Sequence, residues 1–154
     1  MIDPPRILQT AAQTTAIIHL TIPRSEIRKV MGPALAELRA VLASQNVVPT
    51  GPWFSHHLSM KPGVYDFEVG FPVKETVAPS GRVTAGTLPA ASVARTVLHG
   101  SFEGLGAAWA ERDAWVVAQG RKPGPSLVET YLTGPGENPD ATKWETELTR
   151  PLAD

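Results

Sequence analysis

Hydrophobic positions in the first half of the chain follow a strand period, then a helical period, then a strand period again. Segments 14–22, 53–60 and 65–73 are rich in β-branched residues or alternate between polar and apolar positions, which predicts strands. Residues 25–46 predict a helix, with apolar side chains at Ile27, Val30, Met31, Leu35, Leu38 and Leu42. Ser25 is the expected N-cap and Asn46 the expected end, and Pro33 either kinks this helix or delays its regular start.

The second half repeats this order. Segments 91–100, 126–132 and 144–152 predict strands, and residues 101–120 predict a helix that ends at Gly120. Matching residues lie at constant offsets, and the segment 133–143 holds five extra residues in the second copy. The offset is 74 for Gly32 and Gly106, Leu35 and Trp109, and Pro49 and Pro123, and it is 79 for Tyr65 and Trp144 and for Glu68 and Glu147.

The repeat predicts the fold. We expect a single domain over residues 1–154, with repeat one at about 7–74 and repeat two at about 82–152, joined by a turn-rich segment with one short strand near 81–86. Two β-α-β-β units related by a pseudo-twofold axis give an α+β domain. Its antiparallel sheet should carry both helices on one side and a ligand groove on the other.

Composition narrows the function classes. The 154 residues are 42% hydrophobic and 19% charged, as in folded soluble proteins, and the net charge of −1 without a basic run does not favour nucleic acid as a partner. No cysteine is present, which excludes disulfides and thiolate metal sites. We expect no export signal, no membrane span and a cytoplasmic protein, either a monomer or a homodimer.

Several stretches together carry a family likeness. The ordered series "GPWFSHH", "FEVGFPV", "HGSFEGLGAAW", "ETYL" and "WETELTRPL", from about Ala16 to Leu152, resembles the GyrI-like small-molecule-binding domain. This domain serves AraC-type and MerR-type multidrug-responsive activators as their effector-binding part, and we expect a stand-alone member here. The resemblance implies a cleft lined by aromatic side chains, with an acidic residue at its base, for flat, hydrophobic and often cationic compounds. The family's pocket glutamate matches Glu147, and its E-x-Y motif matches Glu129 and Tyr131.

Strand parity adds candidates to this site. If Leu148 packs toward the helices, Glu147 faces the groove, and its repeat partner Glu68 does the same; the alternative is that both are solvated. Tyr131 shares a face with Glu129, and His57 corresponds to Tyr131 at the offset of 74. Trp109 either walls the groove or packs in the core.

The sequence contains neither a metal-binding pattern nor a cofactor motif. His56 and His57 are neighbours in a predicted strand and point to opposite faces, so they do not chelate one metal ion, and no cofactor motif occurs in the sequence. We therefore expect no metal and no cofactor.

Three functions stay open. The first is binding of a flat hydrophobic xenobiotic, by sequestration or sensing. The second is hydrolysis of cyclopropanoid DNA-alkylating compounds, an activity that the resemblance implies for a subset of the family. There Glu147 would be the base and Tyr131 or His57 the proton donor. The third is an interaction protein that has lost its ligand.

Overall fold

The structure is a computed structural model that describes residues 2–59, 62–134 and 137–153. Met60, the last residue of the predicted strand 53–60, lies outside these ranges. The chain forms two compact units. The first unit is Ala11–Ala90, and the second unit is Met1–Thr10 together with Ala91–Asp154. The N-terminal residues belong to the second unit because their strand pairs with a strand of the second repeat.

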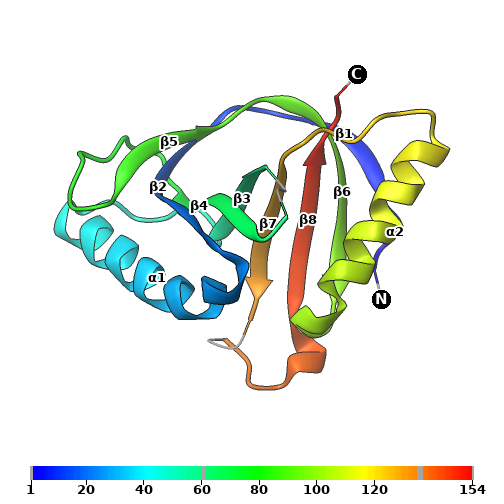
Figure 1. Ribbon diagram of the computed structural model, residues 1–154. Helices are drawn as coiled ribbons and strands as arrows, with labels where there is room; N and C mark the ends of the chain where they lie inside the picture. Colours follow the sequence, from blue (N-terminus) through cyan, green and yellow to red (C-terminus); the bar gives the residue numbers. More distant parts are fainter. Residues whose placement is uncertain (1, 60–61, 135–136, 154) are drawn as a thin grey trace. The chain divides into compact units, whose positions relative to one another are not determined.

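The first unit is a four-stranded antiparallel sheet with one helix (Figure 1). Its strands lie in the order β3-β4-β2-β5. Its elements are β2 (Gln13–Pro23), the 3-10 turn η1 (Arg24–Glu26), α1 (Ile27–Ser44), β3 (Phe54–Ser59), β4 (Val64–Pro72) and β5 (Thr84–Leu88).

An apolar core joins α1 to this sheet. Alternate residues of β2 and β4 point toward the helix, so that Ile18 pairs with Val69 and both are fully buried. From α1, Leu38 and Leu42 pack against them, four residues apart on one helix face.

The second unit has the same construction. Its strands lie in the order β1-β6-β8-β7, all antiparallel. Its elements are β1 (Arg6–Thr10), β6 (Ala91–His99), η2 (Phe102–Gly104), α2 (Leu105–Ala118), β7 (Leu127–Thr133), η3 (Ala141–Lys143) and β8 (Glu145–Pro151). Leu98 of β6 and Leu148 of β8 form a small core with Ala108 of α2.

The predicted duplication is confirmed in detail. Asn46 after α1 and Gly120 after α2 both adopt a left-handed backbone, with φ of 56° and 74°, and so end their helices as expected. The strand pairing shifts register between His57 and Ser59 in one unit and between Tyr131 and Thr133 in the other. The fold class is therefore α+β, as predicted, with strand, helix, strand and strand in each repeat.

One local prediction about α1 was wrong, and one of the two alternatives for Pro33 is excluded. Ser25 is not the N-cap, because it lies inside η1 and the helix begins after Glu26, whose side chain forms no capping hydrogen bond. Pro33 does not delay the helix either, since α1 already begins at Ile27 and continues past it. Pro33 is exposed, so its ring is accommodated on the outer face.

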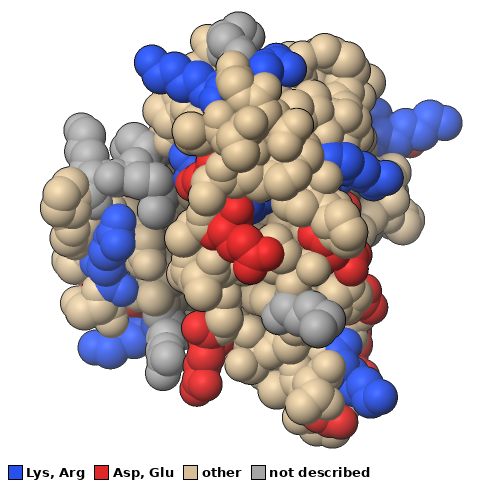
Figure 2. Space-filling model, turned by 90° about the vertical axis from the view of Figure 1, so that its right-hand side faces the viewer, with Lys and Arg blue, Asp and Glu red and all other residues tan. Residues whose placement is uncertain are grey.

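Acidic and basic side chains are interspersed on the face that carries α2 (Figure 2). Within the described part of the chain, no helix combines the length and the apolar character needed to cross a membrane.

Candidate ligand-binding site

Glu129 and Tyr131 lie on the face of the second unit's sheet that α2 covers. In the antiparallel register Glu129 pairs with Leu148 and Tyr131 pairs with Thr146, and paired residues share a face. Leu148 belongs to the core beneath α2. The E-x-Y motif therefore points into the layer between α2 and its own sheet.

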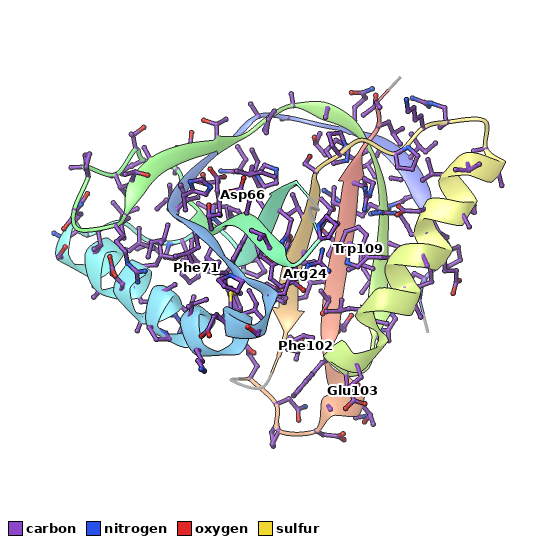
Figure 3. All side chains as sticks on the ribbon, viewed as in Figure 1. Arg24, Asp66, Phe71, Phe102, Glu103 and Trp109 are labelled. Atoms are coloured by element: carbon purple, nitrogen blue, oxygen red, sulfur yellow. The ribbon has the colours of Figure 1, made fainter. Side chains whose placement is uncertain are left out.

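The Glu129 carboxylate is held by two aromatic donors. The indole Nε1–H of Trp109, on α2, donates to Oε2 at 2.7 Å, and the hydroxyl of Tyr131 donates to Oε1 at 2.9 Å. Figure 3 shows the Trp109 side chain directed from α2 toward the sheet. Both donors are neutral, so each carboxylate oxygen is hydrogen-bonded while the negative charge is not cancelled.

Burial raises the pKa of Glu129 above its usual value of 4.5, because the charged form loses its water. The hydrogen bonds from Trp109 and Tyr131 act in the opposite direction, and the effect of burial is larger. Perturbed carboxylates of this kind are concentrated at functional sites. We call Glu129, Trp109 and Tyr131 the Glu129 cluster.

Further aromatic rings contact this cluster, among them Phe102, which lies near the start of α2 (Figure 3). The ring of Phe102 lies 5.9 Å from that of Tyr131, edge-on, and 4.9 Å from that of Trp144. Trp144 donates its Nε1–H to the carbonyl of Asn138 at 2.7 Å. These contacts connect Phe102 and Trp144 to Tyr131, which hydrogen-bonds to Glu129.

Two arginines that were not among the predicted site residues pack against Trp109. The guanidinium of Arg112 lies 4.2 Å from the centre of the Trp109 ring, and that of Arg150 lies 5.5 Å from it. Arg112 is fully buried, and burial lowers its pKa to about 10. The available signal was spacing, since Arg112 follows Trp109 by three residues and precedes the buried Val116 by four, on one helix face.

The two arginines of the second unit stand where the first unit has apolar core residues. At the offset of 74, Arg112 corresponds to Leu38, and at the offset of 79, Arg150 corresponds to Phe71. Both of these residues are buried core side chains of the first unit. The repeat has therefore diverged where α2 meets its sheet, which marks this layer as specialised.

Glu147 lies on the other face of the same sheet. It pairs with Thr130, the residue between Glu129 and Tyr131, so its side chain points away from α2. There Arg95 Nε lies 3.4 Å from its carboxylate. Parity correctly placed Glu147 opposite Leu148, but the structure does not bring it together with Tyr131 as the predicted site required.

Glu68 occupies the equivalent face of the first unit. It pairs with His56 in the register, and His56 Nδ1 lies 3.4 Å from its carboxylate. Glu68 and Glu147 thus each have a histidine or arginine side chain within 3.4 Å.

His57 lies on the α1 side of the first unit, in the position equivalent to Tyr131. Its ring is stacked on Phe67 at 5.1 Å and meets Tyr65 edge-on at 5.3 Å. Its Nε2 lies 3.4 Å from the hydroxyl of Ser55. Burial is the main cause that lowers the pKa of His57 from 6.5 to about 4, so the ring is neutral at physiological pH.

Among the described residues, no group of three or more histidines, aspartates or glutamates is placed to hold a metal ion. The arrangement that the site offers is a desolvated carboxylate beside aromatic rings. Such an arrangement suits an organic cation, through charge attraction and cation–π contact.

The sequence matches the GyrI-like small molecule binding domain over residues 3–153. No curated protein matches the sequence.

Solved structures match the fold at low identity. The EcmrR C-terminal domain is 18% identical, with a TM-score of 0.85 and 98% of each chain covered. EcmrR in its complex with DNA is also 18% identical, with a TM-score of 0.84, and this chain covers 57% of its length while 97% of this chain is aligned. SAV2435, solved with bound tetraphenylphosphonium, is 14% identical, with a TM-score of 0.70, 97% of this chain and 94% of that chain covered. A hydrolase from Listeria innocua is 12% identical, with a TM-score of 0.70, 97% of this chain and 91% of that chain covered.

Proposed function

The chain belongs to the GyrI-like family of small-molecule-binding domains, and from that premise we propose that it binds a hydrophobic aromatic cation at the Glu129 cluster. Binding would serve to sequester or to sense the compound. The observation that carries this proposal is the buried Glu129 carboxylate, whose hydrogen bonds from the described residues come from the neutral groups of Trp109 and Tyr131.

The energetics favour a cation over a neutral ligand of the same shape. A positive charge about 4 Å from a carboxylate gains about 4 kcal/mol at an effective dielectric constant of about 20. Contact with an aromatic ring adds about 0.5–2 kcal/mol. SAV2435, which shares the fold, is known with tetraphenylphosphonium bound, and this supports the choice of that cation as a probe.

Calorimetric titration with tetraphenylphosphonium tests the proposal, with tetraphenylborate as an anion of nearly the same shape. Glu129→Gln should weaken the cation at least about tenfold, equivalent to about 1.4 kcal/mol, and should not weaken the anion. Glu147→Gln is the matched control, because this glutamate faces the other side of the same sheet. Equal losses in the two variants, or no saturable binding in the parent, would refute the proposal.

A second candidate is a hydrolase that opens a strained ring. The favouring observation is the hydrogen bond between the Tyr131 hydroxyl and Glu129, which pairs a phenol with a carboxylate of raised pKa. In this reaction water gives its oxygen to one ring carbon, the strained C–C bond breaks, and the released carbon takes a proton. The carboxylate in this role would be Glu129, since Glu147 lies on the opposite face.

Mass spectrometry distinguishes the two candidates. The protein is incubated with a cyclopropanoid alkylating compound. Formation of the water adduct over many turnovers, together with loss of this turnover in Tyr131→Phe, would support the hydrolase. Saturable binding without turnover would support the binding function alone.

A further inference from the structure

Beside the Glu129 cluster, the same layer of the second unit holds two guanidinium groups, those of Arg112 and Arg150, and the carboxylate of Asp113. Arg112, from α2, donates to Oδ1 of Asp113 through Nη2 at 2.5 Å and through Nε at 3.2 Å. Arg150, from β8, places its Nε 3.2 Å from that same oxygen. Two guanidinium groups thus share one carboxylate oxygen, and Arg150 also donates through Nη1 to the carbonyl of Gly124 at 2.9 Å.

Polar atoms in this layer are buried without hydrogen-bond partners among the described residues. They are Nη1 of Arg112, Nε of Arg150, which lies close to Asp113 but outside hydrogen-bond geometry, and Oγ1 of Thr146. Thr146 and Arg150 stand four residues apart on β8 and share the face that α2 covers. A buried donor on a charged group is costly to leave unpaired, so this layer favours an acceptor from outside the chain.

Trp109 links this positive group to the Glu129 cluster. Its Nε1–H donates to Glu129, while its ring lies 4.2 Å from the guanidinium of Arg112 and 5.5 Å from that of Arg150. One aromatic side chain therefore contacts a carboxylate at its edge and two guanidinium groups at its ring. A planar ligand lying along Trp109 would meet both charges.

We propose that Arg112 and Arg150 form an anion subsite, and that the preferred ligands are zwitterionic aromatic compounds whose cationic end meets Glu129 and whose carboxylate meets the two arginines. This inference rests on the proposed function, since it extends the same site. The donor that Arg112 offers to such a carboxylate is Nη1, which is buried without a partner among the described residues, because Nε and Nη2 already donate to Asp113. Burial lowers the pKa of Arg112 only to about 10, so the group stays charged at neutral pH.

The test compares rhodamine B, a zwitterion with a free carboxylate, with its ethyl ester, which keeps the cationic ring system and loses the anion. Dye fluorescence polarisation gives both affinities for the full chain. We expect the parent to bind rhodamine B about tenfold more tightly than the ester, in line with a charge-assisted hydrogen bond. Arg150→Gln should bring that ratio to about one while leaving the ester within about twofold.

Two further variants protect the test against simple misfolding. Arg150→Lys keeps the charge and should retain part of the preference for rhodamine B. Arg95→Gln removes an arginine from the opposite face of the same sheet, where it pairs with Glu147, and should leave the ratio unchanged.

The outcomes separate the two proposals. Saturable binding of both dyes with equal affinity in the parent, or a preference that survives Arg150→Gln, overturns the anion subsite and leaves the proposed function standing. If neither dye binds, the proposed function is overturned and this inference with it.

Discussion

Replacing Trp109 by Phe removes one of the two donors to Glu129 and keeps an aromatic ring on α2. A hydrogen bond to an ionised group contributes about 1.5–3 kcal/mol, whereas one to a neutral group contributes about 0.5–1.5 kcal/mol. The lost bond is the 2.7 Å contact from Nε1 to Oε2. The variant should therefore lose about 1–1.5 kcal/mol more stability when Glu129 is ionised than when it is protonated.

The sign of the pH dependence follows from the pKa of Glu129. Burial raises this pKa in the folded state, so the parent is stabilised below the unfolded value of 4.5 and loses that stability as pH rises through the folded pKa. The Trp109 hydrogen bond lowers the pKa of Glu129, so its removal raises that pKa further. The stability difference between parent and variant should then grow from pH 4.5 to pH 8.

Urea denaturation followed by far-ultraviolet circular dichroism measures this difference without using tryptophan fluorescence. Trp115→Phe is the matched control, because Trp115 is a half-buried tryptophan of the same helix. Its stability loss should not depend on pH. If Trp109→Phe costs the same at pH 4.5 and pH 8, or if the dependence persists in a Glu129→Gln background, the assigned role of the hydrogen bond is wrong.

Three further outcomes are expected. The pKa of His57 is lowered to about 4, so the stability that its neutral form contributes, about 3 kcal/mol, is complete above pH 6.5 and is lost as pH falls from 6.5 to 4. His57→Gln should remove this part of the pH dependence of stability, measured by urea titration. Gly70→Ala should destabilise the protein by more than about 3 kcal/mol or prevent folding, because the new Cβ would lie 2.4 Å from the carbonyl oxygen of Ala16. Gly32→Ala is the contrast: its Cβ would meet nothing within 4 Å, so it should stabilise α1 by about 0.5–1 kcal/mol in thermal melts. Leu148→Ala should cost about 2–5 kcal/mol in chemical denaturation, because this fully buried side chain joins β8 to α2.

The duplicated sequence pattern predicted the helices and strands of the two repeats, but not the strand β1 (Arg6–Thr10). Helical spacing together with Asn46 and Gly120 predicted both helix ends. A helix often ends with a residue in the left-handed conformation, and glycine and asparagine are the residues that adopt it most readily. The pairing of β1 with β6 could not be predicted. Partners of an edge strand are chosen by tertiary structure, and Arg6–Thr10 lies 81 residues from its partner at the Thr10 and Ala91 pair.

The candidate site was predicted only in part. The alternation in β7 placed Glu129 and Tyr131 on one face, and the alternation in β8 placed Glu147 on the face away from Leu148. Alternation shows which residues of a strand share a face, but not which face the helix covers. Glu147 was therefore grouped with Glu129 and Tyr131, which lie on the opposite face of the sheet. Arg112 has the helical spacing of the buried face of α2, but it was missed because arginine side chains are seldom fully buried.

The most direct test of the central claim is the pKa of Glu129 itself, measured with and without tetraphenylphosphonium. Carbon-13 labelling of glutamate and assignment through the Glu129→Gln spectrum allow the carboxyl signal to be followed through a pH titration. We expect a value above 4.5 in the free protein, since burial raises the pKa of Glu129. Saturating cation should lower it, by about one unit if the ionised form binds about tenfold more tightly. A pKa that the cation leaves unchanged would contradict the claim that Glu129 recognises the charge of the ligand.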